Sequence, residues 1–269
     1  MYNLQQTMNI ECKSNSTKQI YKFHIDNFIK YCNSNVTQDK INPYLNYLVV
    51  EKRYKPSSLG LVKYSLIYYF TKILHQQIIV YIPLIKKDKK LPMVVSKVLI
   101  LKMIDVTTNL KHKIIIELLY SSGIRLSELY NLKWQDIDYE NRLVRVNKGK
   151  GAKDRLSILS QKVVESLKEY QSKRKDNNSY IFINDYNENK RITKRTIQQV
   201  LRNACKKLNL NYIITPHQLR HSLATHLVEN DVNLRKIQIL LGHSNLNTTK
   251  IYTQVAKNDL MNIKNPLDY

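Results

Sequence analysis

Residues 215–227 place two different basic side chains where they could act together on an anion. The segment reads TPHQLRHSLATHL, with His217 and Arg220 close to the start of a predicted helix. Residues three positions apart share a helix face, so this imidazole and this guanidinium point the same way. A planar guanidinium donates two parallel hydrogen bonds to the oxygens of a phosphate group. The pair therefore predicts joint contact with one phosphate.

Several further polar residues each have an ordinary structural explanation when taken singly. Arg125, in SSGIRLSEL, could cap a helix or pair with Glu128. Lys150, in KGKGAKDR, could lie at the tip of a hairpin, and His243, in LLGHSNLNTT, could end a helix. Tyr252 follows in KIYTQV. The order of these residues along the chain is more specific than any one of them.

Taken in that order, the residues resemble the catalytic domain of the tyrosine recombinases, the lambda-integrase and Xer family. The resemblance covers residues 91–255, and residues 16–85 are similar in character to the helical core-binding domain of that family. It implies a mainly α fold with a small β-sheet, in which a helical bundle precedes an α+β catalytic domain. The implied catalytic residues are Arg125, Lys150, His217, Arg220, His243 and Tyr252.

The resemblance implies cleavage and rejoining of duplex DNA through a 3′-phosphotyrosyl intermediate at a short inverted-repeat core site. A phenol has a pKa near 10, so roughly one in a thousand is ionised at pH 7 and Tyr252 needs help as a nucleophile. Arg125 and Arg220 would stabilise the charge on the phosphate and on the phenolate. His217 would act as general acid or base, and His243 would donate a hydrogen bond to the phosphate.

The leaving 5′-hydroxyl needs a proton, and Lys150 resembles the general acid of the family. Lys148 and Lys153 in the same loop are competing candidates, and the GKG context favours Lys150. Glu128 resembles the acid that orients the catalytic arginine. No cofactor is expected, because the phosphotyrosine keeps the ester energy and the sequence has no P-loop, carboxylate cluster or zinc pattern.

Amphipathic patterns predict the elements that position these residues. In the first part of the chain, helices are expected near 16–32, 43–51 and 57–73, with Ser16 or Thr17 capping the first. The charge run KKDKKLP predicts a linker. The expected organisation is a core-DNA-binding domain (1–85), a linker (86–92) and a catalytic domain with a C-terminal tail (93–269).

In the catalytic part, a helix over 111–120 is followed by one starting near Leu126, so that Arg125 lies at a helix start. Residues 142–146 and 155–159 alternate as the two strands of a hairpin. Residues 180–184 suggest a short strand or a loop anchor. Further helices are expected at 161–173, 193–206, 216–229, 233–240 and 248–255.

Composition indicates a globular protein that binds a polyanion. The chain has 269 residues and carries 44 Lys plus Arg against 21 Asp plus Glu, a formal charge of +23. A solvated Lys-rich surface is the alternative explanation. Cys12, Cys32 and Cys205 match neither a disulfide framework nor a zinc site, and no signal peptide or membrane span is evident. A cytoplasmic location is expected.

The expected partner is double-stranded DNA. The chain is expected to act as a homo-oligomer, a tetramer on two DNA sites. A partner recombinase or an accessory protein is a further option. Lys194, Arg195 and Gln198 are the candidates for reading bases. The helices begin within about 16 residues of Met1, so no arm-binding domain is expected. The tail would dock on a neighbouring protomer or, alternatively, fold back; its apolar residues are Val255, Leu260, Met261, Ile263 and Leu267.

Two other functions remain to be weighed against recombination. A type IB topoisomerase would share the chemistry but relax supercoils as a monomer. A catalytically inactive DNA-binding protein would lack the complete set of six residues. The sequence leaves the DNA site and the biological role open.

Overall fold

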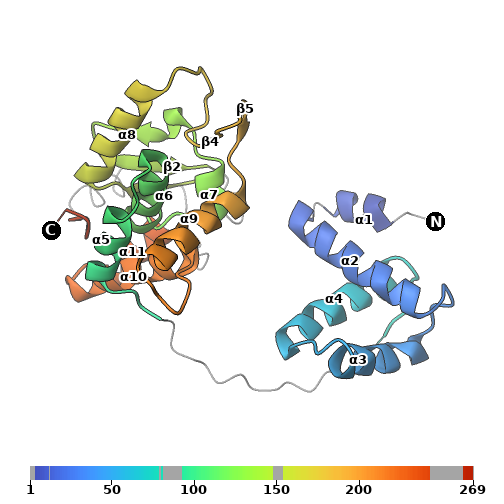
Figure 1. Cartoon of the computed structure of the whole chain (residues 1–269). Coiled ribbons are helices and arrows are strands. Elements are labelled where there is room, and N and C mark those ends of the chain that lie inside the picture. The colour runs from blue at the N-terminus through green and yellow to red at the C-terminus, as the bar shows by residue number, and fades with distance from the viewer. Residues whose placement is uncertain are drawn as a thin grey trace. The chain divides into compact units, whose positions relative to one another are not determined.

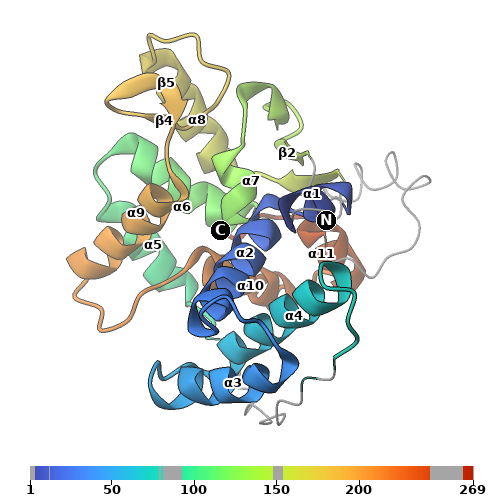
Figure 2. The same cartoon turned by 90° about the vertical axis from the view of Figure 1, so that its right-hand side faces the viewer.

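The computed structural model describes residues 4–11, 13–78, 80, 93–147, 154–242 and 263–268. The chain divides into two compact units, Met1–Lys89 and Lys90–Tyr269 (Figures 1 and 2). Helices dominate both units, and the second unit also contains a small antiparallel sheet. The expectation of a mainly α fold with a small β-sheet is thereby confirmed.

The first unit is a helical bundle. Its helices are α1 (Leu4–Ile10), α2 (Asn15–Tyr31), α3 (Ile41–Val50) and α4 (Pro56–Lys72), with a 3-10 turn at Gln38–Lys40. The three helices expected from the sequence are all present. The expected cap of α2 was wrong, because Ser14 occupies the N-cap and its Oγ accepts a hydrogen bond from the N–H of Thr17 at 3.2 Å.

Aromatic side chains fill the centre of this bundle. Phe28 of α2 is fully buried, with its ring centroid 5.1 Å from that of Tyr44 and 6.1 Å from that of Phe70. Leu66 and Val62 of α4 are buried in the same cluster. The apolar faces read from the sequence are therefore the faces that pack together.

The second unit contains seven α-helices in the part of the chain that the structure describes. They are α5 (Lys97–Asp105), α6 (Leu110–Ser121), α7 (Leu126–Tyr130), α8 (Gln161–Lys173), α9 (Lys194–Lys207), α10 (Pro216–Glu229) and α11 (Leu234–Leu241). A 3-10 turn covers Trp134–Asp136. All except α5 were expected from the sequence to within a few residues. The expected helix at 248–255 and the linker at 86–92 lie outside the described residues.

A three-stranded antiparallel sheet with the order β1-β2-β3 accompanies these helices. Its strands are β1 (Ile137–Asp138), β2 (Leu143–Val146) and β3 (Arg155–Ile158). The expected hairpin is β2–β3, and its last pair before the connecting residues is Val146 with Arg155. In the sequence, Lys150 lies between these two paired residues.

A second, two-stranded sheet pairs β4 (Ile183–Asn184) with β5 (Asn187–Arg191). Residues 180–184 contribute both suggested features, because Tyr180 forms an isolated bridge with Lys133 and β4 is a short strand. The strand β5 was not expected. Its sequence NENKR is polar throughout and mostly exposed, so it shows no alternation of apolar and polar residues.

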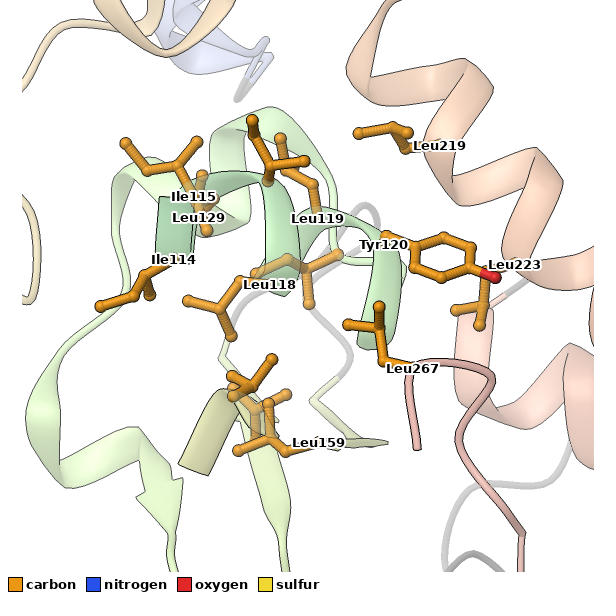
Figure 3. Close-up of a cluster of buried hydrophobic side chains, with 14 of the residues drawn as sticks. Ile114, Ile115, Leu118, Leu119, Tyr120, Leu129, Leu159, Leu219, Leu223 and Leu267 are labelled. Carbon is orange, nitrogen blue, oxygen red and sulfur yellow. The ribbon is translucent and has the colours of Figure 1, made fainter. Parts of the chain in front are cut away.

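Helix α6 lies at the centre of the second unit and packs against α5, α7, α8, α9 and α10. Figure 3 shows its side chains Ile114, Ile115, Leu118, Leu119 and Tyr120, with Leu219 and Leu223 of α10 to one side. Leu267, in the short C-terminal segment 263–268, belongs to the same buried cluster. Asn265 of that segment is buried and donates from Nδ2 to the carbonyl of Ser121 at 2.8 Å.

Candidate active site

Arg125 occupies the N-cap of α7, directly after a sharp break in the chain. Helix α6 ends at Ser121, and Gly123 then turns the chain with φ +57°. A Cβ on Gly123 would lie 2.8 Å from Leu241 Cδ2 and 2.9 Å from Leu223 Cδ2, so glycine permits the close approach of α10 and α11. The break therefore brings Arg125 to the end of α11.

Glu128 holds Arg125 through both its main chain and its side chain. The Arg125 N–H donates to Glu128 Oε2 at 2.7 Å, and Arg125 Nη1 donates to Oε1 at 2.8 Å. The Arg125 side chain is nevertheless 29% exposed, so its guanidinium is accessible to a ligand. The orienting role of Glu128 stays a prediction, and these two hydrogen bonds are the contacts through which it would act.

Arg220 enters the same place from the first turns of α10. That helix starts with a capping box, in which Gln218 N donates to Thr215 Oγ1 at 3.3 Å and Thr215 N donates to Gln218 Oε1 at 2.9 Å. Pro216 fits the first helical position, where no N–H is needed. Arg220 is 5% exposed, and its guanidinium donates to the carbonyls of Gly123 and Leu241.

Three successive carbonyls at the end of α11 each accept a hydrogen bond from a different arginine. Leu240 O accepts from Arg155 Nε at 3.0 Å, Leu241 O accepts from Arg220 Nη2, and Gly242 O accepts from Arg125 Nη2 at 3.3 Å. The last carbonyls of a helix have no partner within the helix and carry partial negative charge. The end of α11 therefore gathers the three guanidinium groups immediately before His243 in the chain.

One carboxylate lies among these three cations. Burial by itself raises the pKa of Glu128, but the hydrogen bonds and charge of Arg155, together with the hydrogen bonds from Arg125, outweigh it and lower the pKa to about 2. Burial and the neighbouring charges of Arg125 and Arg155 lower the pKa of Arg220 to about 9, so it remains cationic near neutral pH. Three guanidinium groups and one carboxylate leave a positive site suited to an anion.

The other sequence-predicted site residues divide into two groups. His217 lies in the first turn of α10 and is exposed, and Lys194, Arg195 and Gln198 are exposed on α9. Lys150, its competitors Lys148 and Lys153, His243 and Tyr252 lie outside the described residues. Among the described residues, the structure thus brings together Arg125, Glu128 and Arg220.

The residue that sequence reasoning missed is Arg155. It donates from Nη1 to Glu128 Oε1 at 2.9 Å and from Nη2 to Glu128 Oε2 at 2.7 Å, and its side chain is 8% exposed. The available signal was a cation at the first position of the strand RLSI, where a long charged side chain needs a partner to be buried. Its partners are distant in sequence, so the pattern alone could not name them.

Cations also gather over aromatic rings near the start of α9. The Arg191 guanidinium lies 4.3 Å from the ring centroid of Tyr130 and 4.6 Å from that of Tyr180. Lys194 Nζ lies 5.5 Å from the Tyr130 ring, and Lys133 Nζ lies 5.2 Å from the Tyr180 ring. Cations held over ring faces in this way make a positively charged surface at α7 and α9.

Two kinds of feature are absent from the described part of the chain. None of its helices has the length and apolar character that crossing a membrane requires. The described residues also contain no group of three or more His, Cys, Asp or Glu side chains placed to hold a metal ion.

Comparisons with known proteins cover both units. The profile of the "Phage integrase family" matches residues 96–259, and that of the "Phage integrase, N-terminal SAM-like domain" matches residues 1–79. The "Tyrosine recombinase XerA" of Pyrococcus horikoshii is 36% identical over 265 residues, which cover 94% of this chain and 88% of that protein. The "Tyrosine recombinase XerD" of Oceanobacillus iheyensis is 31% identical, with coverage of 91% and 89%.

A solved structure has the same fold over nearly the whole chain. The structure described as "Crystal structure of XerH site-specific recombinase bound to difH substrate: pre-cleavage complex" aligns with a TM-score of 0.71 at 22% identity. The alignment covers 94% of this chain and 82% of that one.

Proposed function

Because this chain belongs to the phage integrase family and is a site-specific tyrosine recombinase, we propose that its six predicted catalytic residues act together on one DNA phosphodiester. They are Arg125, Lys150, His217, Arg220, His243 and Tyr252. As a recombinase, the chain is an enzyme that transfers DNA strands, and neither the topoisomerase alternative nor the inactive DNA-binding protein is favoured by its relatives.

The convergence of Arg125 and Arg220 on adjacent carbonyls of α11 is the observation that carries this proposal. Each guanidinium has five N–H groups, and only some of them are occupied by the hydrogen bonds described above. The remaining N–H groups can bind the non-bridging oxygens of a phosphate, where negative charge builds up during attack. Arg220 remains cationic near neutral pH although it is buried, so the site can attract the anion.

In the proposed reaction the Tyr252 oxygen attacks the phosphorus, and His217 accepts the phenolic proton. A bond forms between the tyrosine oxygen and phosphorus while the bond from phosphorus to the 5′-oxygen breaks. Lys150 supplies the proton that turns the leaving oxygen into a hydroxyl, and His243 donates a hydrogen bond to the phosphate. Attack by a 5′-hydroxyl of another strand reverses these steps and restores a phosphodiester, so no nucleotide needs to be hydrolysed.

The proposed substrate is duplex DNA with an inverted-repeat core site, bound by a homo-oligomer, in our proposal a tetramer in the cytoplasm. The structurally similar XerH recombinase was solved bound to its difH substrate, which supports DNA as the partner of this chain. Lys194, Arg195 and Gln198 are proposed to contact the DNA, because they are exposed on α9 beside the cations held over Tyr130 and Tyr180.

We further propose that residues 1–85 bind the core DNA, that 86–92 link the domains and that 93–269 carry catalysis. The tail is proposed to dock on a neighbouring protomer in the DNA-bound assembly. In the single chain, Leu267 packs in the core of its own unit and Gln161 N donates to Asp268 Oδ1 at 3.0 Å. Docking on a neighbour would exchange contacts of this kind between subunits.

A nicked suicide substrate tests the proposed chemistry. Cleavage near the nick releases a short strand, so religation is prevented and the covalent adduct accumulates. Wild-type protein should form an adduct that Tyr252→Phe abolishes, whereas Tyr186→Phe, at a tyrosine 98% exposed in the same unit, should retain it. A chelator should leave the yield unchanged. Absence of a Tyr252-dependent adduct at any candidate inverted repeat would refute the proposal.

A further inference from the structure

We infer that Arg155 is a positioning residue for strand cleavage, because it joins the base of the β2–β3 hairpin to both Glu128 and the end of α11. The inference rests on the proposed function, in which Arg125 and His243 act on the phosphate and the hairpin carries Lys150. Arg155 ends the KGKGAKDR segment around Lys150, but it is not one of the six predicted catalytic residues.

The contacts of Arg155 distinguish it from Arg125. Three of its N–H groups are bound within the protein, two by Glu128 and one by Leu240 O, and its side chain is 8% exposed. Arg125 shares the same carboxylate but is 29% exposed. Arg155 is therefore turned toward the protein, and it acts on the phosphate only through the residues it holds.

Glu128 transmits the first effect of Arg155. Each carboxylate oxygen accepts one hydrogen bond from Arg155 and one from Arg125, the second through either the side chain or the main chain. The paired donation from Arg155 fixes the plane of the carboxylate, and that plane fixes the Arg125 guanidinium. Without Arg155, Glu128 could rotate or take up a proton.

Leu240 and Gly242 transmit the second effect. Arg155 Nε binds Leu240 O at 3.0 Å, and a Cβ on Gly242 would lie 2.7 Å from Arg155 Cδ. The Arg155 side chain thus lies directly against the turn with φ +62° that ends α11, one residue before His243. Because Arg155 pairs with Val146 as the hairpin's last pair before the connecting residues, the two catalytic segments share one anchor.

Arg155→Gln and Arg155→Lys in the full chain test this role. The readout is the single-turnover rate of adduct formation on the nicked substrate at saturating DNA, together with the dissociation constant for DNA. Arg155→Gln should slow cleavage about 10- to 100-fold, the usual effect of losing a residue that orients a catalytic group. The DNA dissociation constant should change less than about threefold, since phosphate contacts elsewhere dominate affinity.

Arg174→Gln is the matched control for a loss of stability. Arg174 is also a nearly buried arginine of the second unit, with its side chain 7% exposed, paired with Asp176 and donating to the carbonyls of Tyr180 and Ile181. These partners are all distinct from Glu128 and from the end of α11. Arg174→Gln should cleave DNA at nearly the wild-type rate under conditions in which both variants are folded.

A pH profile separates positioning from general structural support. The charged groups facing Glu128 are Arg125, Arg155 and Arg220. Burial raises the pKa of Glu128, and Arg155 contributes most to lowering it, so loss of Arg155 should raise that pKa. Compared with wild type, the cleavage rate of Arg155→Gln should then fall additionally as the pH is lowered and Glu128 is protonated. Arg155→Lys should restore the wild-type pH profile while recovering only part of the rate, and Glu128→Gln combined with Arg155→Gln should abolish the extra slope.

The outcomes distinguish the positioning role from the proposed function. Wild-type cleavage by Arg155→Gln, or a loss equal to that of Arg174→Gln with no added pH dependence, would overturn the positioning role and leave the proposed function intact. Failure of the wild-type protein to form a Tyr252 adduct would overturn the proposed function and, with it, this inference.

Discussion

The main-chain N–H and the guanidinium of Arg125 bind different oxygens of the Glu128 carboxylate, at 2.7 and 2.8 Å. The main chain and the side chain of Arg125 therefore both bind the Glu128 carboxylate. This arrangement ties the start of α7 to the orientation of the side chain that α7 presents. A change at Glu128 should consequently affect both stability and catalysis.

Glu128→Gln should make the free energy of unfolding of the second unit vary less with pH in the acid range. The folded-state pKa of Glu128 is lowered from 4.5 to about 2, so its contribution is fully present above pH 4.5 and is lost as pH falls towards 2. A shift of this size corresponds to about 3 kcal/mol. The measurement is urea unfolding between pH 2 and 7, followed by the fluorescence of Trp134, the only tryptophan. An equal wild-type advantage over Glu128→Gln at pH 2.5 and pH 7 would contradict the pKa assignment.

Arg220→Lys should lower the single-turnover cleavage rate by about 100-fold or more, although the charge is kept. A lysine is a point charge and cannot donate to Gly123 O, Leu241 O and a phosphate from one plane. Arg235→Lys, at an exposed position early in α11, is the control and should leave the rate unchanged. Similar rates for the two variants would show that geometry at Arg220 does not matter.

Gly242→Ala should reproduce the defect of the Arg155 variants. Any L side chain is strained at φ +62°, and the new Cβ would displace Arg155. We expect cleavage to slow at least about 10-fold by the same positioning argument, measured on the nicked substrate. Gly60→Ala is the contrasting variant, because its Cβ meets nothing within 4 Å in α4, and it should stabilise the first unit by about 0.5–1 kcal/mol.

Ser222→Ala should destabilise the second unit by about 1–3 kcal/mol, the cost of leaving a buried donor without its partner. Ser222 Oγ accepts from the buried Val95 N–H at 2.8 Å and so links α10 to the segment before α5. Ser172→Ala, at an exposed serine of α8, should cost under about 0.5 kcal/mol. Urea unfolding followed through Trp134 compares the two, and equal midpoints would contradict the prediction.

Local signals in the sequence were sufficient for most helices of the second unit. Helix α10 was predicted with its observed bounds because Thr215 and Pro216 mark its start and an apolar stripe runs through Leu219 and Leu223. The cap of α2 was misplaced because Ser14 and Ser16 are equally suitable residues, and only the fold decides which one has the extended backbone. Helix α5 was missed because a short apolar run is ambiguous between helix and strand.

The candidate site was only partly accessible to sequence reasoning. Arg125, Glu128 and Arg220 were recognised from their local contexts, and the structure brings them together. Arg155 lies 27 residues from Glu128 and 85 from Leu240, so its role depends on contacts that no local pattern encodes. The polar strand β5 was hidden for a related reason, since it pairs through its backbone and buries little.

The three arginines at the end of α11 all donate to main-chain carbonyl oxygens. These acceptors remain in place when the side chains of that helix are replaced. Alanine scanning of Leu240 and Leu241 would report their packing and leave every one of these acceptors in place. Amide-to-ester replacement, which makes the carbonyl a poorer acceptor, is the perturbation that would reveal them one at a time. Mutational surveys restricted to side chains would therefore undervalue this part of the enzyme.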